Sequence, residues 1–411
     1  MKARTASVKA RTPGTAQPII VLKFGGSSLA TPELRALAAQ RVRQAIEEGV
    51  TPVVITSAIG RLPSPYATDS LIALAPGASA GPNRDLLLAC GEVIGAAVFA
   101  ELLASIGIAA RALTGGQAGI ATDATHGDAR IAAVDPAPIR ELLAARITPV
   151  IAGFQGVAAD GSVTTLGRGG SDLTAVAVTA ALGDASLEIV TDVDGVMTAD
   201  PRRVSDAHTI ERLTLEEVTE LAGLGAKVMH DKAADLARDA NIPYTVRSLR
   251  SGVGSSIGGD GASDRVRPVT GLATIVGYSF IHVVPEAAVM PGGWEQNVFR
   301  AMYDATINLD CINVNAAGVF FIVQDADLER ARELLEPLPV AVRSRRDCAK
   351  VSIVGAGMRG TPGVMYRVVE ALSKAGVPII HSTDSNITIS VLVPGTMAAT
   401  AEQVLHAYFK L

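Results

Sequence analysis

Two patterns of apolar and polar positions alternate over the first part of the chain, namely short continuous apolar runs and longer amphipathic segments. Continuous apolar runs at 18–22, 51–57 and 148–152 predict buried strands, because parallel strands covered on both faces have few polar positions. Between the first two runs, Thr31 is placed to cap an amphipathic helix, and Gly49 is placed to end it. Repeated strand–helix alternation of this kind predicts an α/β domain with a mostly parallel sheet and helices on both faces.

The same pattern predicts the remaining elements of this domain. They are strands at 108–113 and 187–191, helices at 85–106, 137–145 and 172–183 (the last with Asp172 as its cap), and a hairpin at 159–161. Thr214 and Glu217 have the spacing of a capping box and predict the start of another helix. The apolar segment 86–106 is about long enough to cross a bilayer, but Glu92 and Glu101 would place ionised groups in hydrocarbon. We therefore expect a buried helix of a large core and no membrane contact.

A change in composition follows this domain. The segment 248–267 is rich in glycine and serine and is predicted to be a linker. Beyond it, a Pro-Gly pair, a helix and an apolar strand occur twice, starting at Pro291 and Pro362, so a small β-α-β module is expected in two copies. The second copy contains a literal G-x-G-x-x-G at 355–360, but only 51 residues follow it. That is too few for a dinucleotide-binding domain, so a loop of the module is the better interpretation.

Composition narrows the class of protein. A chain of 411 residues is expected to form two or three domains, and 48% apolar against 19% charged residues indicates a globular protein. A net charge of −5 gives no reason to expect nucleic acid as a partner. Three widely separated cysteines favour a reducing cytoplasm, and six scattered histidines lack metal-ligand spacing. The first 17 residues carry four basic and no acidic groups and are expected to form a disordered tail.

The first candidate site is the sequence VLKFGGSS at 21–28. Lys23 precedes the pair Gly25 and Gly26, whereas the lysine of a P-loop follows its glycines. A glycine turn at the end of a strand can hold a phosphate on its amide groups. The residues alone leave a tight turn without a ligand as the alternative.

Two later strand ends carry polar residues of related chemistry. The segment 164–172 has three glycines within four positions and a predicted helix start, which attracts anions. Within it, Arg168 can bind a carboxylate or a phosphate with two hydrogen bonds. The segment 191–202 begins with Thr191 and Asp192 at a strand end, where open α/β sheets bind ligands. A solvated arginine and an ordinary Asp-Gly turn are the alternatives.

Glu92 is the remaining candidate. It lies on an otherwise apolar helix, and a buried carboxylate needs a partner. The small neighbours Gly91 and Gly95 are expected to leave room for a partner outside the chain, such as a substrate ammonium, with an internal salt bridge as the alternative. The basic and acidic residues of these motifs suit phosphoryl transfer, which needs positioning and charge neutralisation.

These motifs together resemble those of the aspartate kinases, a branch of the amino-acid kinase family. They are KFGGSS at 23–28, LLLACGE at 86–92, GRGGSD at 167–172, TDVDGVMTADPR at 191–202 and GAKVMH at 225–230, in the family's order and spacing. The resemblance implies a three-layer αβα kinase domain at 18–250, a linker at 251–268, and two ferredoxin-like ACT domains at 269–345 and 346–411. It also implies phosphorylation of the β-carboxylate of L-aspartate by Mg-ATP, giving 4-phospho-L-aspartate, as the first step of lysine, threonine and methionine biosynthesis.

The resemblance further implies roles for individual residues. Lys23 would hold the transferring phosphoryl group, and Asp172 would orient nearby lysines. The substrate would contact Ser57, Thr68, Glu92 through its ammonium, Arg168 through its α-carboxylate, Gly169, Gly170 and Ser171. ATP would contact Lys23, Phe24, Gly25, Gly26, Thr191, Asp192, Met197, Arg202 and Lys227. An effector would contact Asp310, Asn313, Met358 and Gly363, and Mg²⁺ would be carried by ATP without a protein side chain as ligand.

The chemistry of this reaction explains why no histidine is needed as a general base. The β-carboxylate of aspartate, with a pKa of about 3.9, is already ionised at neutral pH and needs no general base. Two departures from the family pattern are Met197, where tyrosine is common, and Asp231, where proline is common. The resemblance implies a cytoplasmic homodimer, paired through the ACT domains, with lysine, threonine or diaminopimelate as effector. The alternatives are a kinase acting on glutamate, N-acetylglutamate or a nucleoside monophosphate, and a non-catalytic amino-acid sensor.

Overall fold

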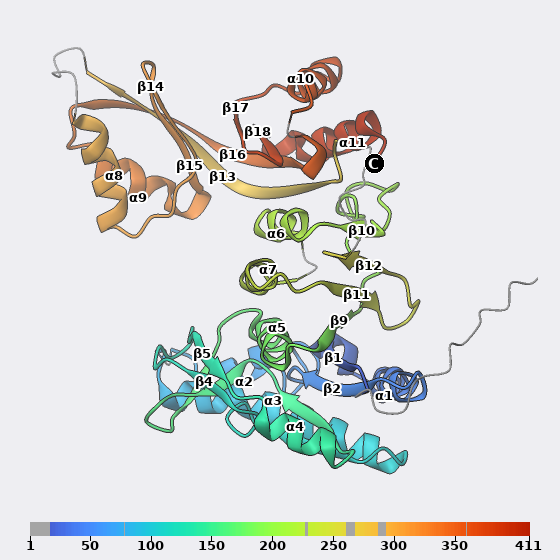
Figure 1. The fold of residues 1–411 in the computed structure, drawn as a ribbon. Helices are drawn as coiled ribbons and strands as arrows, with labels where there is room; N and C mark the ends of the chain where they lie inside the picture. Colours follow the sequence, from blue (N-terminus) through green and yellow to red (C-terminus); the bar gives the residue numbers. More distant parts are fainter. Residues whose placement is uncertain (1–16, 78, 227–228, 260–267, 287–292, 359) are drawn as a thin grey trace, which may run out of the picture. The chain divides into compact units, whose positions relative to one another are not determined.

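The computed structural model describes residues 17–77, 79–226, 229–259, 268–286, 293–358 and 360–411. The chain forms two compact units, which divide between Val190 and Thr191. Each unit contains its own helices and strands (Figure 1). Residues 1–16 of the predicted tail, and the Pro-Gly pair at 291–292, lie outside the described residues.

The first unit is organised around a parallel sheet, as predicted. Its strands are β1 (Ile19–Phe24), β2 (Thr51–Thr56), β3 (Ala110–Leu113), β6 (Thr148–Ala152) and β9 (Ala185–Thr191), in the order β9-β1-β2-β6-β3. Every adjacent pair in this order is parallel. The central strands are almost wholly buried, which explains their continuous apolar sequence.

Helices cover both faces of this sheet. They are α1 (Pro32–Glu47), α3 (Pro82–Ser105), α4 (Ala137–Ala144) and α5 (Gly170–Leu182), while α2 (Thr68–Leu74) packs on α3. Lys23 of β1 forms an ion pair with Asp172 on α5, whereas the next residue, Phe24, packs against Phe99 of α3 with 5.5 Å between ring centroids. Because successive side chains of a strand point to opposite faces, α5 and α3 lie on opposite faces of the sheet (Figure 1). The three-layer αβα prediction is therefore confirmed.

The helix ends follow local rules, with one exception. Thr31 caps α1 by accepting a hydrogen bond from the Leu34 N–H, and Gly49 follows the helix with φ of 77°. The prediction that Asp172 caps α5 is wrong, because the cap is Gly169, with φ of 70°, and Asp172 lies in the first turn. The Asp172 carboxylate is directed instead at the Lys23 amino group, 2.5 Å away.

A second, smaller sheet packs beside α3. It consists of β4 (Ile120–Thr122), β5 (Ile131–Val134), β7 (Gln155–Val157) and β8 (Val163–Thr165), in the order β5-β4-β7-β8, and the predicted hairpin joins β7 to β8. Helix α3 is long and apolar enough to cross a membrane, and half of its most apolar 18-residue stretch is buried inside the protein. It packs on β3, β6 and β8 and buries Asp85 and Glu92, so it is a core helix of this unit.

The second unit begins with three short strands and two helices. They are β10 (Arg212–Leu213), β11 (Tyr244–Ser248), β12 (Gly254–Ile257), α6 (Leu215–Gly223) and α7 (Asp231–Asp239), with strand order β10-β12-β11. The predicted capping box of Thr214 and Glu217 starts α6. Strand β12 lies inside the segment predicted to be a linker. A Cβ on Gly254 would lie 2.2 Å from the Val246 carbonyl oxygen, so this glycine permits close strand packing rather than flexibility.

The rest of the second unit is one antiparallel sheet with four helices. The strands are β13 (Gly271–Pro285), β14 (Asp310–Asn315), β15 (Gly318–Gln324), β16 (Val340–Val354), β17 (His381–Asp384) and β18 (Thr388–Pro394), in the order β14-β15-β13-β16-β18-β17. The helices are α8 (Trp294–Asp304), α9 (Leu328–Leu335), α10 (Val364–Lys374) and α11 (Ala398–Phe409). Helices α8 and α9 pack on one core and α10 and α11 on another, and we call these parts the α8–α9 module and the α10–α11 module.

The two modules are not separate bodies joined by a boundary at residue 345. Strands β13 and β16, each 15 residues long, contribute to both cores and pair with each other along their length. The predicted boundary falls inside β16. Irregular pairing around Gly277, which has φ of 85°, marks the point where one module passes into the other.

Candidate functional site

The glycine turn after β1 brings main chain close to Lys23. Gly26 begins the short helix η1 (Gly26–Leu29), and a Cβ on it would lie 2.4 Å from the Ala58 carbonyl oxygen. Only glycine therefore fits where the chain after β2 crosses this turn. At Gly25, by contrast, a Cβ would meet only the Nζ of Lys23 at 3.7 Å and the Oγ of Ser27 at 4.0 Å. The lysine amino group thus lies directly over the main chain of Gly25.

Asp172 fixes the position of this amino group. Its Oδ1 lies 2.5 Å from Nζ of Lys23, and the two side chains are only 13% and 11% exposed. Asp172 lies in the first turn of α5, so the amino group is held at the N-terminal end of that helix. A helix N-terminus and a lysine together favour the binding of an anion.

Glu92 is a buried carboxyl group on α3. It is 3% exposed, and burial raises its pKa to about 8, against the opposing effects of the Ala58 N–H hydrogen bond and the charge of Lys23. Within the part of the chain that the structure describes, Oε2 of Glu92 has no hydrogen-bond partner. A buried acceptor of this kind is expected to be satisfied by a ligand.

The glycines beside Glu92 do not leave room for that ligand, contrary to the prediction. A Cβ on Gly91 would lie 2.7 Å from the Tyr66 carbonyl oxygen, and a Cβ on Gly95 would lie 2.5 Å from the Ser57 carbonyl oxygen. The main chain between β2 and α2 fills this space. The two glycines therefore seat that segment, which includes Ser57, against α3, and Thr68 begins α2 at the end of the segment.

Arg168 lies on an exposed loop between β8 and α5. The glycines on either side of it have left-handed backbones, with φ of 73° at Gly167 and 70° at Gly169. A Cβ on Gly167 would lie 2.4 Å from Oδ1 of Asp128. The loop is thus tightly packed at its base, while the guanidinium is exposed to solvent. Gly170 and Ser171, which follow it, are buried at the start of α5.

Asp85 supports this loop, a role that no sequence motif indicated directly. The carboxylate is fully buried and accepts hydrogen bonds from the Thr165 N–H at 3.0 Å, the Thr165 hydroxyl at 2.7 Å and the Gly127 N–H at 3.1 Å. Nδ1 of His126 lies 2.8 Å away. Asp85 therefore ties the start of α3 to the end of β8, three residues before Arg168. An acid in the first turn of a helix is the one local signal, and it is common to many helices.

The remaining predicted ATP contacts belong to the second unit. Thr191 ends β9, and its hydroxyl donates to Oδ1 of the exposed Asp192 at 3.2 Å. Met197 forms an isolated bridge with Thr209. Arg202 is exposed and is paired with Asp200, at 2.6 Å between NH2 and Oδ2. Lys227 lies outside the described residues.

The predicted effector contacts fall on two segments. Asp310 and Asn313 lie on β14, where Asp310 forms an ion pair with the buried Lys350. Met358 and Gly363 lie between β16 and α10, Met358 being buried and Gly363 capping α10 with φ of 85°. The literal G-x-G-x-x-G is thus part of the connection from β16 to α10.

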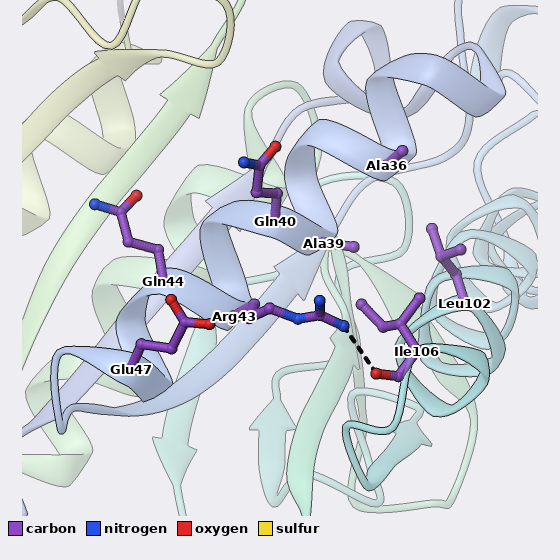
Figure 2. A pocket seen from close by; sticks show the side chains of 8 residues that line it. All are labelled: Ala36, Ala39, Gln40, Arg43, Gln44, Glu47, Leu102 and Ile106. Carbon is purple, nitrogen blue, oxygen red and sulfur yellow. Dashed lines mark hydrogen bonds between the residues drawn. The ribbon is translucent and has the colours of Figure 1, made fainter.

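The structure also contains a surface hollow that is unrelated to these residues. It has a volume of about 480 Å³ and lies between α1 and the end of α3 (Figure 2). Its lining residues are Ala36, Ala39, Gln40, Arg43, Gln44, Glu47, Leu102 and Ile106. No predicted site residue is among them. Over the described ranges, no group of three histidine, cysteine, aspartate or glutamate residues could hold a metal ion.

Comparisons with known proteins give a consistent result. A model of the amino acid kinase family matches residues 18–248, and a model of the ACT domain matches residues 343–407. Aspartokinase 1 of Bacillus subtilis is 40% identical over 402 residues, which are 96% of this chain and 99% of the relative. The aspartokinase of Corynebacterium glutamicum is 39% identical over 412 residues, covering 96% of each chain.

Solved structures show the same fold. Escherichia coli aspartokinase III in complex with aspartate and ADP matches with a TM-score of 0.74 at 24% identity, over 96% of this chain and all of that one. Clostridium acetobutylicum aspartate kinase matches with a TM-score of 0.78 at 22% identity, with the same coverage.

Proposed function

The chain belongs to the amino acid kinase family and, within it, to the aspartokinases, and from this membership we propose how its residues perform the reaction. The protein transfers a phosphoryl group from ATP to the β-carboxylate of L-aspartate, giving 4-phospho-L-aspartate and ADP. This reaction is a step in the biosynthesis of aspartate-derived amino acids. The observation that carries the assignment is 40% identity along almost the full length of an aspartokinase.

Lys23 binds the transferring phosphoryl group in this proposal. The reaction brings a carboxylate to a polyphosphate, so its barrier is largely the repulsion between two anions. The Lys23 amino group, held by Asp172 at 2.5 Å, offers a fixed positive charge. The Gly25 and Gly26 amides and the N-terminus of α5 add partial positive charge beside it.

Glu92 and Arg168 bind the two ends of the aspartate backbone. The open oxygen of Glu92 accepts from the substrate ammonium, and the exposed Arg168 guanidinium binds the α-carboxylate with two hydrogen bonds. Ser57, Thr68 and the turn Gly169–Ser171 complete the contacts. The β-carboxylate is then left free to attack the γ-phosphorus, and no side chain needs to remove a proton.

ATP is bound as its magnesium complex. The nucleotide contacts proposed on the second unit are Thr191, Asp192, Met197, Arg202 and Lys227. Magnesium usually keeps several waters and binds through substrate phosphates with few protein ligands, so we expect the phosphates of ATP to carry it. When bound, the ion neutralises charge on the phosphates.

Membership of the aspartokinases also supports proposals for the effector site, for the pairing of subunits and for the cellular compartment of the protein. We propose that Asp310, Asn313, Met358 and Gly363 contact an amino-acid effector, either lysine, threonine or diaminopimelate. The ACT modules would pair two subunits into a homodimer. The three cysteines are all free, which favours the cytoplasm.

Trapping the acyl phosphate with hydroxylamine tests this proposal. The purified chain with Mg-ATP should form hydroxamate with L-aspartate, and far less with glutamate or N-acetylglutamate. Lys23→Ala should lower kcat by at least about a hundredfold while the chain remains folded, and Lys374→Ala, at an exposed pair on α10, should not. Near-normal turnover of the Lys23 variant would contradict the role of Lys23, and absence of hydroxamate with aspartate would contradict the reaction.

A further inference from the structure

The segment that carries Met197 and Arg202 is built into the core of the α10–α11 module. Ala199 and Val204 are buried in the same hydrophobic cluster as Val368 of α10 and Leu405 of α11. The Leu272 N–H at the start of β13 donates to the Thr198 carbonyl oxygen at 2.8 Å. The segment is thus packed on the regulatory part of the second unit.

Helix α11 adds polar contacts to this packing. Glu402 is fully buried; its Oε1 accepts from the Asp200 N–H at 3.4 Å, and its Oε2 lies 3.5 Å from NH1 of Arg203. One turn along the helix, Nε2 of the buried His406 lies 2.9 Å from the Thr198 hydroxyl. Two buried polar side chains of one helix therefore hold the same short segment at both of its ends.

Asp200, which Glu402 contacts, in turn binds Arg202. Asp200 binds the Arg202 guanidinium through Nε at 2.9 Å and NH2 at 2.6 Å, and it also accepts from the Arg202 N–H at 3.0 Å. The Arg203 N–H in turn donates to the Asp200 carbonyl oxygen at 2.9 Å. A shift of Asp200 or Arg203 would therefore move Arg202.

We propose that Glu402 and His406 are positioning residues for ATP binding, which act by fixing residues 198–203 and hence the placement of Met197 and Arg202. The proposal rests on the proposed function, in which Met197 and Arg202 contact the nucleotide. A packing role alone is the ordinary alternative. It predicts a loss of stability with no preference for one substrate, whereas positioning predicts a selective loss of nucleotide affinity.

The burial of the Glu402 and His406 side chains is consistent with a fixed position for each of them. Burial raises the pKa of Glu402 and lowers the pKa of His406. A buried polar group that loses its partner is costly, so each group has one favoured position. Because α11 also packs on β13, β16 and β18, any rearrangement of the module is transmitted to the segment through these contacts.

The test compares two substitutions at the buried contacts, one on α11 and one on the segment that it holds, with one on the exposed face of α11, all in the full chain. Glu402→Gln removes the charge facing Arg203, and Thr198→Val removes the hydroxyl facing His406. Thr400→Ala, on the exposed face of the same helix, is the matched control. Both core variants should raise the KM for ATP and the Kd for ADP about five- to tenfold and leave the KM for aspartate within twofold of wild type.

Two outcomes would favour a packing role alone. Unchanged nucleotide constants with a lowered thermal midpoint, or an equal rise of both KM values, would overturn the proposal. Because the Kd for ADP is measured by titration calorimetry without turnover, it still tests the proposal if the wild-type chain fails to phosphorylate aspartate. If Glu402→Gln does not fold, Thr198→Val decides, since it keeps the shape of the side chain.

Discussion

The buried Glu92 is expected to make aspartate binding depend on pH. Burial raises its pKa to about 8 in the free protein, so the carboxyl group is mostly protonated at neutral pH. Only the ionised form can bind the substrate ammonium as proposed. The apparent affinity is then reduced by the ionised fraction, which is about one tenth at pH 7 and about one hundredth at pH 6.

Steady-state kinetics measure this effect directly. With saturating Mg-ATP, the KM for aspartate should fall about tenfold from pH 6 to pH 7, fall further toward pH 8, and level off above it. Both carboxylates of aspartate stay ionised throughout this range. Glu92→Gln should have a high KM at every pH and no slope. Titration calorimetry at pH 7 in two buffers of different ionisation enthalpy should show release of about 0.9 proton on binding.

Two results would refute this reasoning. The first is a KM for aspartate that changes less than twofold between pH 6 and pH 8. The second is the same slope in Glu92→Gln as in the wild type.

The pH dependence of the free energy of unfolding gives an independent check on the pKa of Glu92. The folded chain retains a proton on Glu92 that the unfolded chain loses above pH 4.5, so the free energy of unfolding should fall as pH rises from 4.5 to 8, by on the order of 5 kcal/mol from this group.

Three substitutions test other parts of the site. Arg168→Gln should raise the KM for aspartate roughly a hundredfold by removing a charge-assisted bidentate contact, with the KM for ATP unchanged; equal effects on both would count against the assigned role. Gly26→Ala should lower the free energy of unfolding by about 1–3 kcal/mol, because its Cβ would lie 2.4 Å from a carbonyl oxygen, whereas Gly25→Ala should leave the urea midpoint unchanged. Asp85→Asn should cost about 2 kcal/mol of stability and raise the KM for aspartate more than that for ATP; equal changes would limit Asp85 to a structural role.

Local patterns in the sequence were sufficient to predict most of the strands and helices of the first unit. The apolar runs at β1, β2 and β6 identified a buried parallel sheet, and the cap at Thr31 predicted the start of α1. In the second unit, the capping box at Thr214 predicted the start of α6 in the same way. These features depend on neighbours in the chain, which a sequence displays directly. The site motifs also follow strand ends, where an open α/β sheet is expected to bind ligands, and the roles of their residues stay predictions.

Contacts between distant residues were the part that the sequence did not reveal. Asp85 bonds Thr165, 80 positions away, and only the folded chain brings the two together. Gly91 and Gly95 were interpreted as leaving space for a ligand, but main chain from another segment occupies it. Gly254 was interpreted as part of a flexible linker, yet it lies in a strand for the same reason. For these three glycines, the small residue indicated a close approach of main chain without identifying the partner.

The paired strands β13 and β16 set a limit on how this chain can be divided. Each is 15 residues long, which is about 50 Å of extended chain, and each contributes to both C-terminal cores. A gene fragment ending near residue 345 would cut β16 and leave an open edge prone to aggregation. Although the sequence shows two copies of one motif, the smallest piece that recombination or a protein engineer could transfer intact is therefore the whole stretch from β13 to α11.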